Sequence, residues 1–325
     1  MACAMRRQDW DYPEAARVIA AMIAAMKYPL LRLPLALLFV APVFVGQVAV
    51  WNLARSVGKV PVALASVFIA CVLGWAAYAL YTRLVEKRAA FELGRAGALQ
   101  ELGAGLAIGA ALFGASVGVL ALFGAYRITG VREDLATMVI PLCVSVAAAG
   151  IEEIVFRGVI FRLLKESLGT WLALAISALL FGFGHLMSPN VTLLALLAIV
   201  FEAGIMLAAA YLLTRRLWLA IGIHAAWNFT QSGIFSVPTS GIAMHGLFVA
   251  ELSGPPWLTG GAFGVEASVV AVVLCTALGL TLLALAARRG RFIAPFWRRP
   301  AAPAVAPATA RSPARPGPAT APSGP

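Results

Sequence analysis

Three polar patterns interrupt an otherwise apolar part of this sequence, and each contains side chains that can move protons or bind charge. The first is Glu-Glu-x-x-x-Arg at 152–157, the second is Phe-x-x-x-His at 181–185, and the third is His-x-x-x-Asn at 224–228. A charge in the middle of a bilayer costs at least about 2.5 kcal/mol, so charges that remain there usually face a bundle interior or a water-filled cavity. The three patterns therefore predict a buried polar site.

The first pattern contains two acids, of which only one has an ion-pair partner within the pattern. Glu153 and Arg157 stand four residues apart, so a helix brings them within reach of an ion pair that partly cancels both charges. Such a pair serves either as a fastener between helices or as support for a site. Glu152 is left as the unpaired acid, and a carboxylate of this kind suits a general base that takes a proton from water.

The other two patterns supply imidazole and amide groups. His224 and Asn228 stand four residues apart, so one helix face presents both to a common space, where they can donate hydrogen bonds to an oxyanion. His185 adds a second imidazole, with Phe181 one turn before it as a packing partner. Alternatively, two histidines and two carboxylates can bind zinc, for which Glu152, His185 and His224 are the candidate ligands.

The elements that position these residues are predicted to be membrane-spanning helices. The chain has 325 residues, of which 62% are hydrophobic and only 12% charged, with a mean hydropathy of +0.91. Soluble domains contain about 25% charged residues. Apolar stretches of roughly 20 residues recur, each long enough to cross a bilayer core, and the alternating pattern of a barrel strand is missing. We therefore predict an all-α fold, a polytopic transmembrane helical bundle of about eight spans. They are expected near residues 33–51, 60–82, 102–126, 136–161, 170–187, 191–213, 217–236 and 267–287.

The basic residues predict the orientation of this bundle. The formal net charge of +11 is spread between the spans, which favours an effect of topology over nucleic-acid binding. With the N-terminus inside, the outer segments contain only Arg55, Lys59, Arg127 and Arg132 of the 25 lysines and arginines. Both termini are thus predicted to be cytoplasmic, in a bacterial inner or plasma membrane.

The spans divide the chain into six expected regions. These are a cytoplasmic or interfacial segment at 1–32, with an interfacial helix at 14–27; N-terminal transmembrane helices at 33–134; a core at 135–236; an outer loop at 237–266; the last transmembrane helix at 267–287; and a cytoplasmic Pro/Ala-rich tail at 288–325, disordered from residue 300. The four scattered cysteines imply no disulfide framework, and no cleaved signal peptide is expected.

Two polar residues outside the three patterns are not assigned to the chemistry. Glu202 lies inside the sixth span, where helix packing or cavity lining explains it better than catalysis. His245 lies in the expected outer loop and receives no role.

Depth in the membrane is a difficulty for a shared site. At about 1.5 Å per residue, Glu152 lies roughly 15 Å from the inner end of its span, His224 roughly 10 Å and His185 more than roughly 20 Å. A tilt, a kink or a different boundary of the fifth span is needed to bring the three side chains together.

The order of the three patterns resembles that of the CPBP family, the CAAX-protease and bacteriocin-processing group (ABI domain) that includes the Rce1-type endoproteases. The resemblance covers residues 135–235, and the stretch 213–218 is also typical of that family. It implies that Glu152 activates water with help from His185, and that His224 and Asn228 stabilise the oxyanion. Glu153 and Arg157 would then shape the site.

The expected activity is that of an intramembrane endopeptidase, acting on a membrane-embedded or lipid-anchored protein or peptide. Prenylated CAAX proteins are the substrates of the best-known relatives. We favour a glutamate mechanism without a cofactor, since the chain lacks the zinc motif His-Glu-x-x-His, and a zinc-dependent version is the alternative. A non-catalytic scaffold or immunity protein and a transporter with a proton relay are the competing functions.

Overall fold

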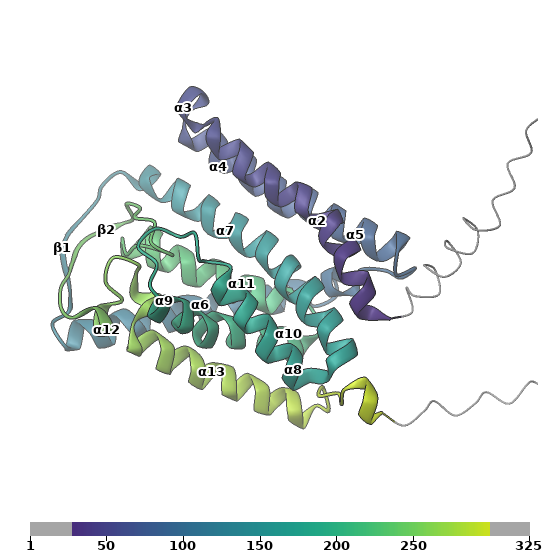
Figure 1. The fold of residues 1–325 in the computed structure, drawn as a ribbon. Helices are drawn as coiled ribbons and strands as arrows, with labels where there is room; N and C mark the ends of the chain where they lie inside the picture. The colour runs from purple at the N-terminus through teal and green to yellow at the C-terminus, as the bar shows by residue number, and fades with distance from the viewer. Residues whose placement is uncertain (1–27, 300–325) are drawn as a thin grey trace, which may run out of the picture.

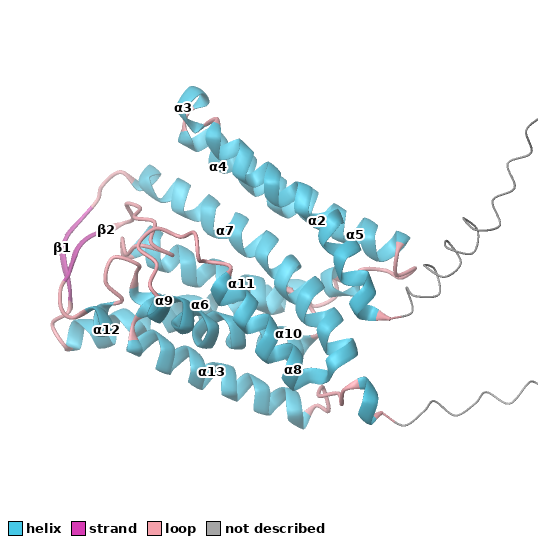
Figure 2. Cartoon of the chain, viewed as in Figure 1, coloured by secondary structure: helices cyan, strands magenta, loops and turns pink. Residues whose placement is uncertain are grey.

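The computed structural model describes residues 28–299, so the helix expected at 14–27 and the disorder expected from residue 300 lie outside the described residues. Within 28–299 the chain folds into a bundle of long helices with one short pair of strands, as Figures 1 and 2 show. The predicted all-α class is therefore confirmed.

The first two spans form a hairpin along one side of the bundle. It consists of α2 (Pro29–Asn52), α3 (Ala54–Val57), α4 (Lys59–Val67), the π-helical segment η1 (Phe68–Leu73) and α5 (Gly74–Leu84). Pro29 lies in the first turn of α2, where the N–H that proline lacks has no partner within the helix. The hairpin packs through α4 on α7 (Val139–Glu153), which lies beneath it in Figure 1.

Helices α6 (Ala98–Leu122) and α11 (Trp218–Phe229) pack tightly against each other, and glycines make the close approach feasible. A Cβ atom at Gly105 would lie 2.5 Å from the Leu219 carbonyl oxygen, and one at Gly109 would lie 2.3 Å from that of Ile223. Both distances are far inside van der Waals contact, so only glycine fits. The backbone next to His224 is thereby held directly against α6.

A single apolar helical stretch, Leu135–Phe183, covers two of the predicted spans. It begins with the 3₁₀ turn η3 (Leu135–Met138) and continues through α7, the π-helical segment η4 (Ile154–Phe161) and α8 (Arg162–Phe183). Gly169 breaks α8 with a φ of +79°, a conformation that glycine adopts without a Cβ penalty. The chain reverses there, as expected between the spans predicted at 136–161 and 170–187.

The remaining helices complete the bundle. They are α9 (Leu193–Ile199), η5 (Val200–Ile205) and α10 (Met206–Thr214), which form one continuous span; α11 with the π-helical segment η6 (Thr230–Ile234); α12 (Pro256–Thr259); the 3₁₀ turn η7 (Val265–Ala267); α13 (Val269–Arg288); and the 3₁₀ turn η8 (Phe296–Arg298).

Six helical stretches among the described residues are long and apolar enough to cross a membrane, against eight predicted spans. The break at Gly169 accounts for one of the two missing spans. The other is the stretch 218–234, made of α11 and η6, which is shorter than the other six. With both included, the helices correspond one to one with the predicted spans.

The expected outer loop contains structure that the sequence did not predict. Strand β1 (Tyr126–Val131) pairs antiparallel with β2 (Phe248–Leu252), beginning with Tyr126 opposite Leu252. Arg132 fastens the end of this sheet by donating hydrogen bonds to the carbonyl oxygens of Gly246 and Phe248. The loop is therefore folded against the bundle.

The opposite end of the bundle is held by buried ion pairs. Arg162 donates to Glu86 at 2.8 Å and lies 3.5 Å from Glu92, while Arg88 pairs with both acids. Glu92 belongs to the 3₁₀ turn η2 (Phe91–Leu93), and both acids are almost completely buried. The turn between α5 and α6 is thus fixed to the start of α8.

Candidate active site

One cavity of about 590 Å³ collects the residues of all three polar patterns. Glu152 enters it from α7, His185 from the turn after α8, and His224 and Asn228 from α11. Apolar side chains of α2, including Leu37, form another part of the wall. The four proposed catalytic residues therefore share a cavity despite the different depths that their spans implied.

Glu153 is the buried centre of the site. It is fully inaccessible, and its Oε1 accepts hydrogen bonds from Nη1 of Arg157 at 2.9 Å and from Nδ1 of His224 at 2.8 Å. The ion pair predicted between Glu153 and Arg157 is present. Because an ionised carboxylate only accepts hydrogen bonds, Nδ1 of His224 carries the proton, and this contact fixes the orientation of the ring.

Arg157 is held from two further sides. Its Nη2 donates to the carbonyl oxygen of Ala203 at 2.9 Å, and its guanidinium lies 4.2 Å from the centre of the Phe181 ring. Phe181 also contacts the rings of His185 and His224, with centroids 5.3 and 6.2 Å away. The phenylalanine of the second pattern therefore packs against the residues of the other two.

Glu152 has different surroundings from its neighbour Glu153. Its side chain is 24% exposed and faces the cavity, and within 28–299 no group donates a hydrogen bond to it. Across the cavity from it, Nε2 of His224 lies 3.9 Å from Oε2 of Glu152. A single oxygen atom at about 2.8 Å from each fits between them, as a bridging water does.

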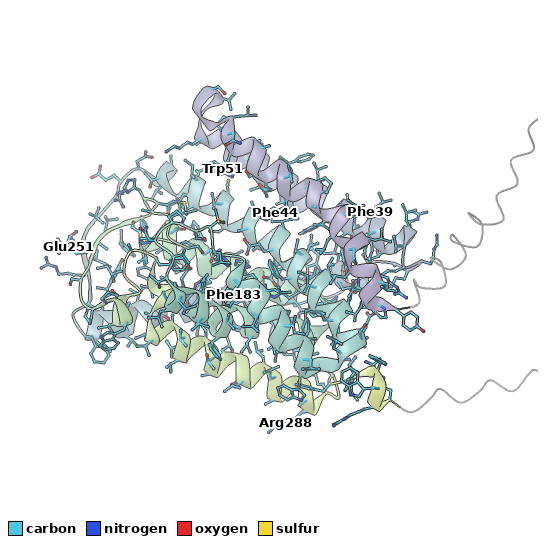
Figure 3. The ribbon with its side chains drawn as sticks, viewed as in Figure 1. Phe39, Phe44, Trp51, Phe183, Glu251 and Arg288 are labelled. Atoms are coloured by element: carbon cyan, nitrogen blue, oxygen red, sulfur yellow. The ribbon has the colours of Figure 1, made fainter. Side chains whose placement is uncertain are left out.

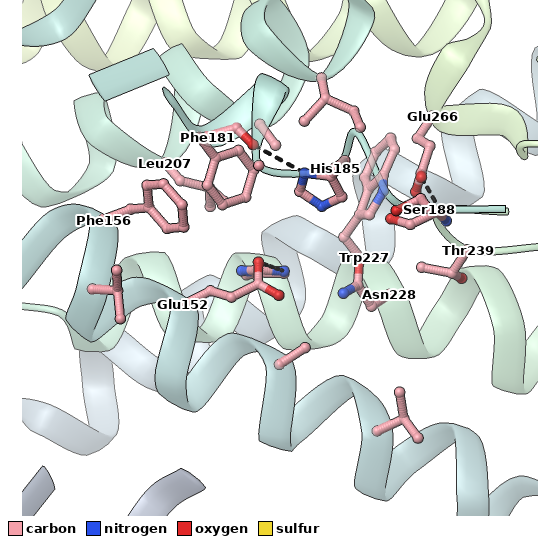
Figure 4. Close-up of a pocket in the computed structure, with 18 of the residues that line it drawn as sticks. Glu152, Phe156, Phe181, His185, Ser188, Leu207, Trp227, Asn228, Thr239 and Glu266 are labelled. Atoms are coloured by element: carbon pink, nitrogen blue, oxygen red, sulfur yellow. Dashed lines mark hydrogen bonds and ion pairs between the residues drawn. The ribbon is translucent and has the colours of Figure 1, made fainter. Parts of the chain in front are cut away.

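His185 uses one ring nitrogen to contact the backbone and keeps the other available. Nδ1 lies 2.9 Å from the carbonyl oxygen of Phe181, which can only accept, so Nδ1 carries a proton and Nε2 is the ring nitrogen that this contact leaves free. Helix α8 ends at Phe183, four residues before the predicted end of the fifth span, and His185 lies on the following turn. Figure 4 shows its imidazole in the cavity, between Glu152 and Glu266 in that view.

The helices change geometry where they meet the cavity. The π-helical segment η4 begins directly after Glu153, η5 contains Glu202, and η6 begins two residues after Asn228. A π-helical turn shifts the phase of the side chains that follow it, and such turns are common at functional sites. This feature carries no signal in the sequence, because the same residues read as ordinary apolar helix.

Sequence reasoning missed one acidic residue of the cavity. Glu266 is 4% exposed and lines the cavity together with Thr239 and Ser240 of the outer loop. Its only signal in the sequence is that it is the last residue of the expected outer loop, directly before the span predicted at 267–287. Glu202, for which helix packing or cavity lining was expected, lines the same cavity.

The alternative zinc ligands do not form a metal site in this arrangement. Across residues 28–299, no group of three or more His, Cys, Asp or Glu side chains is placed to hold a metal ion. One nitrogen of His224 is already engaged by Glu153, and the other lies 3.9 Å from Glu152. Two ligand atoms bound to one tetrahedral zinc at about 2.0–2.2 Å lie roughly 3.4 Å from each other, so this pair is only about 0.5 Å wider than a pair of zinc ligands.

Fold and site together define a polytopic membrane protein with a buried glutamate and imidazole site. Comparison with known families gives the same class: residues 134–230 match the family model described as type II CAAX prenyl endopeptidase Rce1-like. This segment therefore forms an Rce1-like domain, and the suspected CPBP/CAAX-protease relationship is confirmed. It contains all three polar patterns, whereas α2, Glu266 and α13 lie outside it. Neither the curated proteins nor the solved structures contain a match to this chain.

Proposed function

We propose that this protein is a CAAX-type intramembrane endopeptidase in which Glu152 activates the attacking water, without a metal. The observation that carries the proposal is the placement of Glu152 opposite Nε2 of His224, at 3.9 Å across an apolar cavity. A carboxylate without a hydrogen-bond donor can accept a proton from water, and the imidazole opposite is held in place by Glu153.

The reaction follows from this geometry. Water between Glu152 and His224 attacks the carbonyl carbon of the scissile bond, a carbon–oxygen bond forms, and the water proton passes to Glu152. The carbonyl oxygen becomes an oxyanion. When the carbon–nitrogen bond breaks, the leaving nitrogen takes the proton from Glu152, which regenerates the carboxylate and releases an amine and a carboxylic acid. In the neutral ring of His185, Nε2 is the acceptor that receives a hydrogen bond from the water and orients it.

His224 and Asn228 stabilise the oxyanion. The Asn228 amide faces the cavity and can donate from its nitrogen. Nε2 of His224 is a donor only when the ring is doubly protonated, since Nδ1 already donates to Glu153. In that form each ring N–H faces an acid, since Glu153 lies 2.8 Å from Nδ1 and Glu152 lies 3.9 Å from Nε2.

We propose that the substrate is a membrane-embedded or lipid-anchored protein or peptide. The α2 side of the cavity wall is apolar and contains Leu37, Val40 and Phe44. An apolar chain or lipid group can pack there while a peptide bond reaches the polar end. Prenylated CAAX proteins, after which the matched family is named, are one such class.

Replacing Glu152 by glutamine tests the function. The amide keeps the shape of the side chain but cannot accept the proton, so we expect a loss of at least about 100-fold in cleavage. Terminal proteomics of cells that produce the wild type or Glu152→Gln would show the lost cleavages. Glu251→Gln, on the exposed surface, is the matched control. Processing that persists unchanged in Glu152→Gln would end the protease proposal in favour of a scaffold or a transporter.

Chelation separates the glutamate mechanism from its zinc alternative. We expect the purified protein to keep its cleavage rate after prolonged treatment with 1,10-phenanthroline and EDTA, and elemental analysis to find no stoichiometric metal. Activity that disappears on chelation and returns with added zinc would establish the metalloprotease instead.

A further inference from the structure

The cavity contains two more carboxylates that the proposed reaction does not use. Glu202 is 2% exposed and Glu266 is 4% exposed, and both line the cavity. They come from different elements, η5 and η7, and each is close enough to interact electrostatically with the other. Two like charges facing one apolar volume repel each other strongly, so the arrangement favours a positive group between them.

Glu202 has no hydrogen-bond or ion-pair partner among residues 28–299, although its side chain is almost completely buried. A buried carboxylate without a donor is unfavourable by several kcal/mol in an apolar setting. Because Glu202 lines the cavity, its oxygens are directed to the space where a bound molecule would lie.

Glu266 is held in position by the folded outer loop. Its Oε1 accepts a hydrogen bond from the backbone N–H of Ser240 at 2.6 Å. Ser240 and Gly241, with φ values of +47° and +80°, form the tip of a tight turn closed by mutual hydrogen bonds between Thr239 and Ile242. A Cβ at Gly241 would lie only 1.8 Å from the Pro189 carbonyl oxygen, so the turn packs tightly against the backbone at Pro189.

The cavity wall around Glu202 and Glu266 has no side chain that is always positively charged. The wall contains the acids Glu152, Glu202 and Glu266 and the imidazoles of His185 and His224, but no lysine or arginine. His185 lowers the pKa of Glu266, although burial, the larger effect, raises it above its ordinary value. A cation bound beside the two acids would favour their charged forms against this effect of burial.

We propose that Glu202 and Glu266 form a subsite for an organic cation of the substrate, an ammonium or guanidinium group of the peptide. The inference rests on the proposed endopeptidase function and adds a substrate preference to it. The residues of the described chain that surround the two acids offer no third ligand for a metal ion. An ammonium or guanidinium needs only acceptors, and two carboxylates can receive several of its N–H groups.

The position of the subsite relative to Glu152 determines the specificity. In Figure 4, Glu266 and Glu152 lie on opposite sides of His185. A peptide cleaved beside Glu152 therefore carries its positive group a fixed number of residues from the scissile bond. The group is a lysine or arginine side chain, or the free amino terminus of a short segment.

Binding to the inactive Glu152→Gln protein tests the subsite without requiring cleavage. The probe is a pool of N-acetylated, C-terminally amidated apolar decapeptides in which lysine, arginine or uncharged norleucine occupies each position in turn. The full-length variant is immobilised in phosphatidylcholine nanodiscs, and retained peptides are quantified by mass spectrometry. We expect peptides with the charge at one favoured position to be retained at least tenfold over their norleucine counterparts. A second pool with free amino termini and no basic side chain identifies the α-ammonium if that is the cation.

Glutamine variants assign the effect to the two acids. Adding Glu202→Gln or Glu266→Gln to Glu152→Gln should remove the preference for charged peptides while retention of the norleucine peptides stays the same. Glu251→Gln in the same background is the matched control, because Glu251 is exposed and pairs with Arg127 outside the cavity. Thermal unfolding of each variant shows whether it is folded. If one of the two variants does not fold, the other still shows whether the charge preference depends on this pair of acids.

Two results would overturn the subsite. The first is equal retention of charged and norleucine peptides by the Glu152→Gln protein. The second is a charge preference that survives in both Glu202→Gln and Glu266→Gln, which would assign it to another surface. If the wild type cleaves no peptide while the binding preference depends on both acids, the endopeptidase function fails and the cation subsite stands.

Discussion

Glu152 and Glu153 are neighbours in sequence, yet the structure gives them opposite surroundings. Consecutive helical residues point about 100° apart, so one side chain reaches the cavity while the other is turned into the protein. Glu153 receives two hydrogen bonds, from Arg157 and His224, whereas Glu152 receives none in the described chain. One helix turn thus supplies an acid for chemistry and an acid that positions other groups.

This difference predicts different results for the two glutamine variants. Glu153→Gln leaves the buried charge of Arg157 uncompensated, so we expect the free energy of unfolding to fall by about 3 kcal/mol. Cleavage should also fall, because His224 loses the acceptor that orients it. Glu152→Gln removes no hydrogen bond and should change stability by less than about 0.5 kcal/mol. Thermal and denaturant unfolding of both variants in the same detergent provides the measurement. Equal stability of the two would contradict the assigned roles.

The sequence indicated part of this site. The Glu153 to Arg157 pair follows from helical spacing, and so does the shared face of His224 and Asn228. The hydrogen bond from His224 to Glu153 joins residues 71 positions apart, and no local pattern encodes such a contact. The same holds for Glu266, which reaches the cavity only because the outer loop folds back onto the bundle.

At the scale of elements, the contact between α6 and α11 sets the position of His224 and Asn228. Gly109 lies under the Ile223 carbonyl group, directly before His224, and Gly105 lies under Leu219 one turn earlier. The Gly105 to Gly109 spacing was visible in the sequence but, as a common helix contact, did not identify the partner helix. Apolar spans of similar length and composition offer many pairings, and the choice depends on side-chain fit over the whole surface.

Gly109→Ala should therefore displace α11 and with it the site residues His224 and Asn228. The added methyl group would lie 2.3 Å from the Ile223 oxygen, so α11 must shift, and we expect a loss of about 1–3 kcal/mol in stability together with slower cleavage. Gly114→Ala is the matched control on α6, because a Cβ there meets nothing within 4 Å. Alanine is the better helix former by about 1 kcal/mol, so this control should be neutral or slightly stabilising. A Gly109→Ala protein with wild-type stability and rate would show that the contact is looser than described.

The turn between α5 and α6 predicts a sensitivity to acid. Burial by itself raises the pKa of Glu86, but the charges and hydrogen bonds of Arg162 and Arg88 outweigh it and hold the pKa below its ordinary value of 4.5. A lowered pKa contributes stability above the ordinary value, and this contribution disappears as the pH falls through the pKa of the folded protein. The wild type should lose stability in this window below pH 4.5.

The Glu86→Gln variant checks the assignment. It should be less stable than the wild type at pH 7, by roughly 1–3 kcal/mol, because Arg162 and Arg88 lose a charged acceptor. Its unfolding midpoint should depend less on pH between pH 5 and roughly pH 3. Parallel pH profiles for wild type and variant would mean that Glu86 does not contribute to the acid response.

At the scale of the whole molecule, the cavity joins three parts of the chain that are far apart in sequence. The Rce1-like domain supplies the proposed chemistry, α2 supplies an apolar wall, and the outer loop with Glu266 supplies an acidic end. Composition and apolar run lengths were sufficient for the class of fold, since a bilayer limits the choice to helices here. They gave no information on the β1–β2 pair, whose short strands lie between long apolar spans.

The arrangement also predicts an orientation in the membrane. The described chain begins with α2 and ends after α13 at one end of the bundle, and the β1–β2 pair lies at the other end, as Figure 1 shows. The buried pairs of Arg88 and Arg162 lie at the end of α5, on the side expected to be cytoplasmic from its excess of basic residues. Arg127 and Arg132, which the sequence assigned to the outside, lie on or beside β1.

Single cysteines at the two ends test the orientation. Figure 3 labels two exposed positions for them: Glu251 on β2, and Arg288 at the far end of α13. With the four natural cysteines replaced by alanine, Glu251→Cys should react with a membrane-impermeant maleimide in intact bacterial host cells. Arg288→Cys should react only after permeabilisation. The reverse labelling pattern would show that the bundle has the opposite orientation in the membrane. Reaction at both positions in intact cells would contradict an even number of spans with a cytoplasmic C-terminus. The orientation depends on the retention of basic segments on the cytoplasmic side. Adding lysines next to Arg127 and Arg132 should therefore weaken the preference for an N-terminus inside the cell.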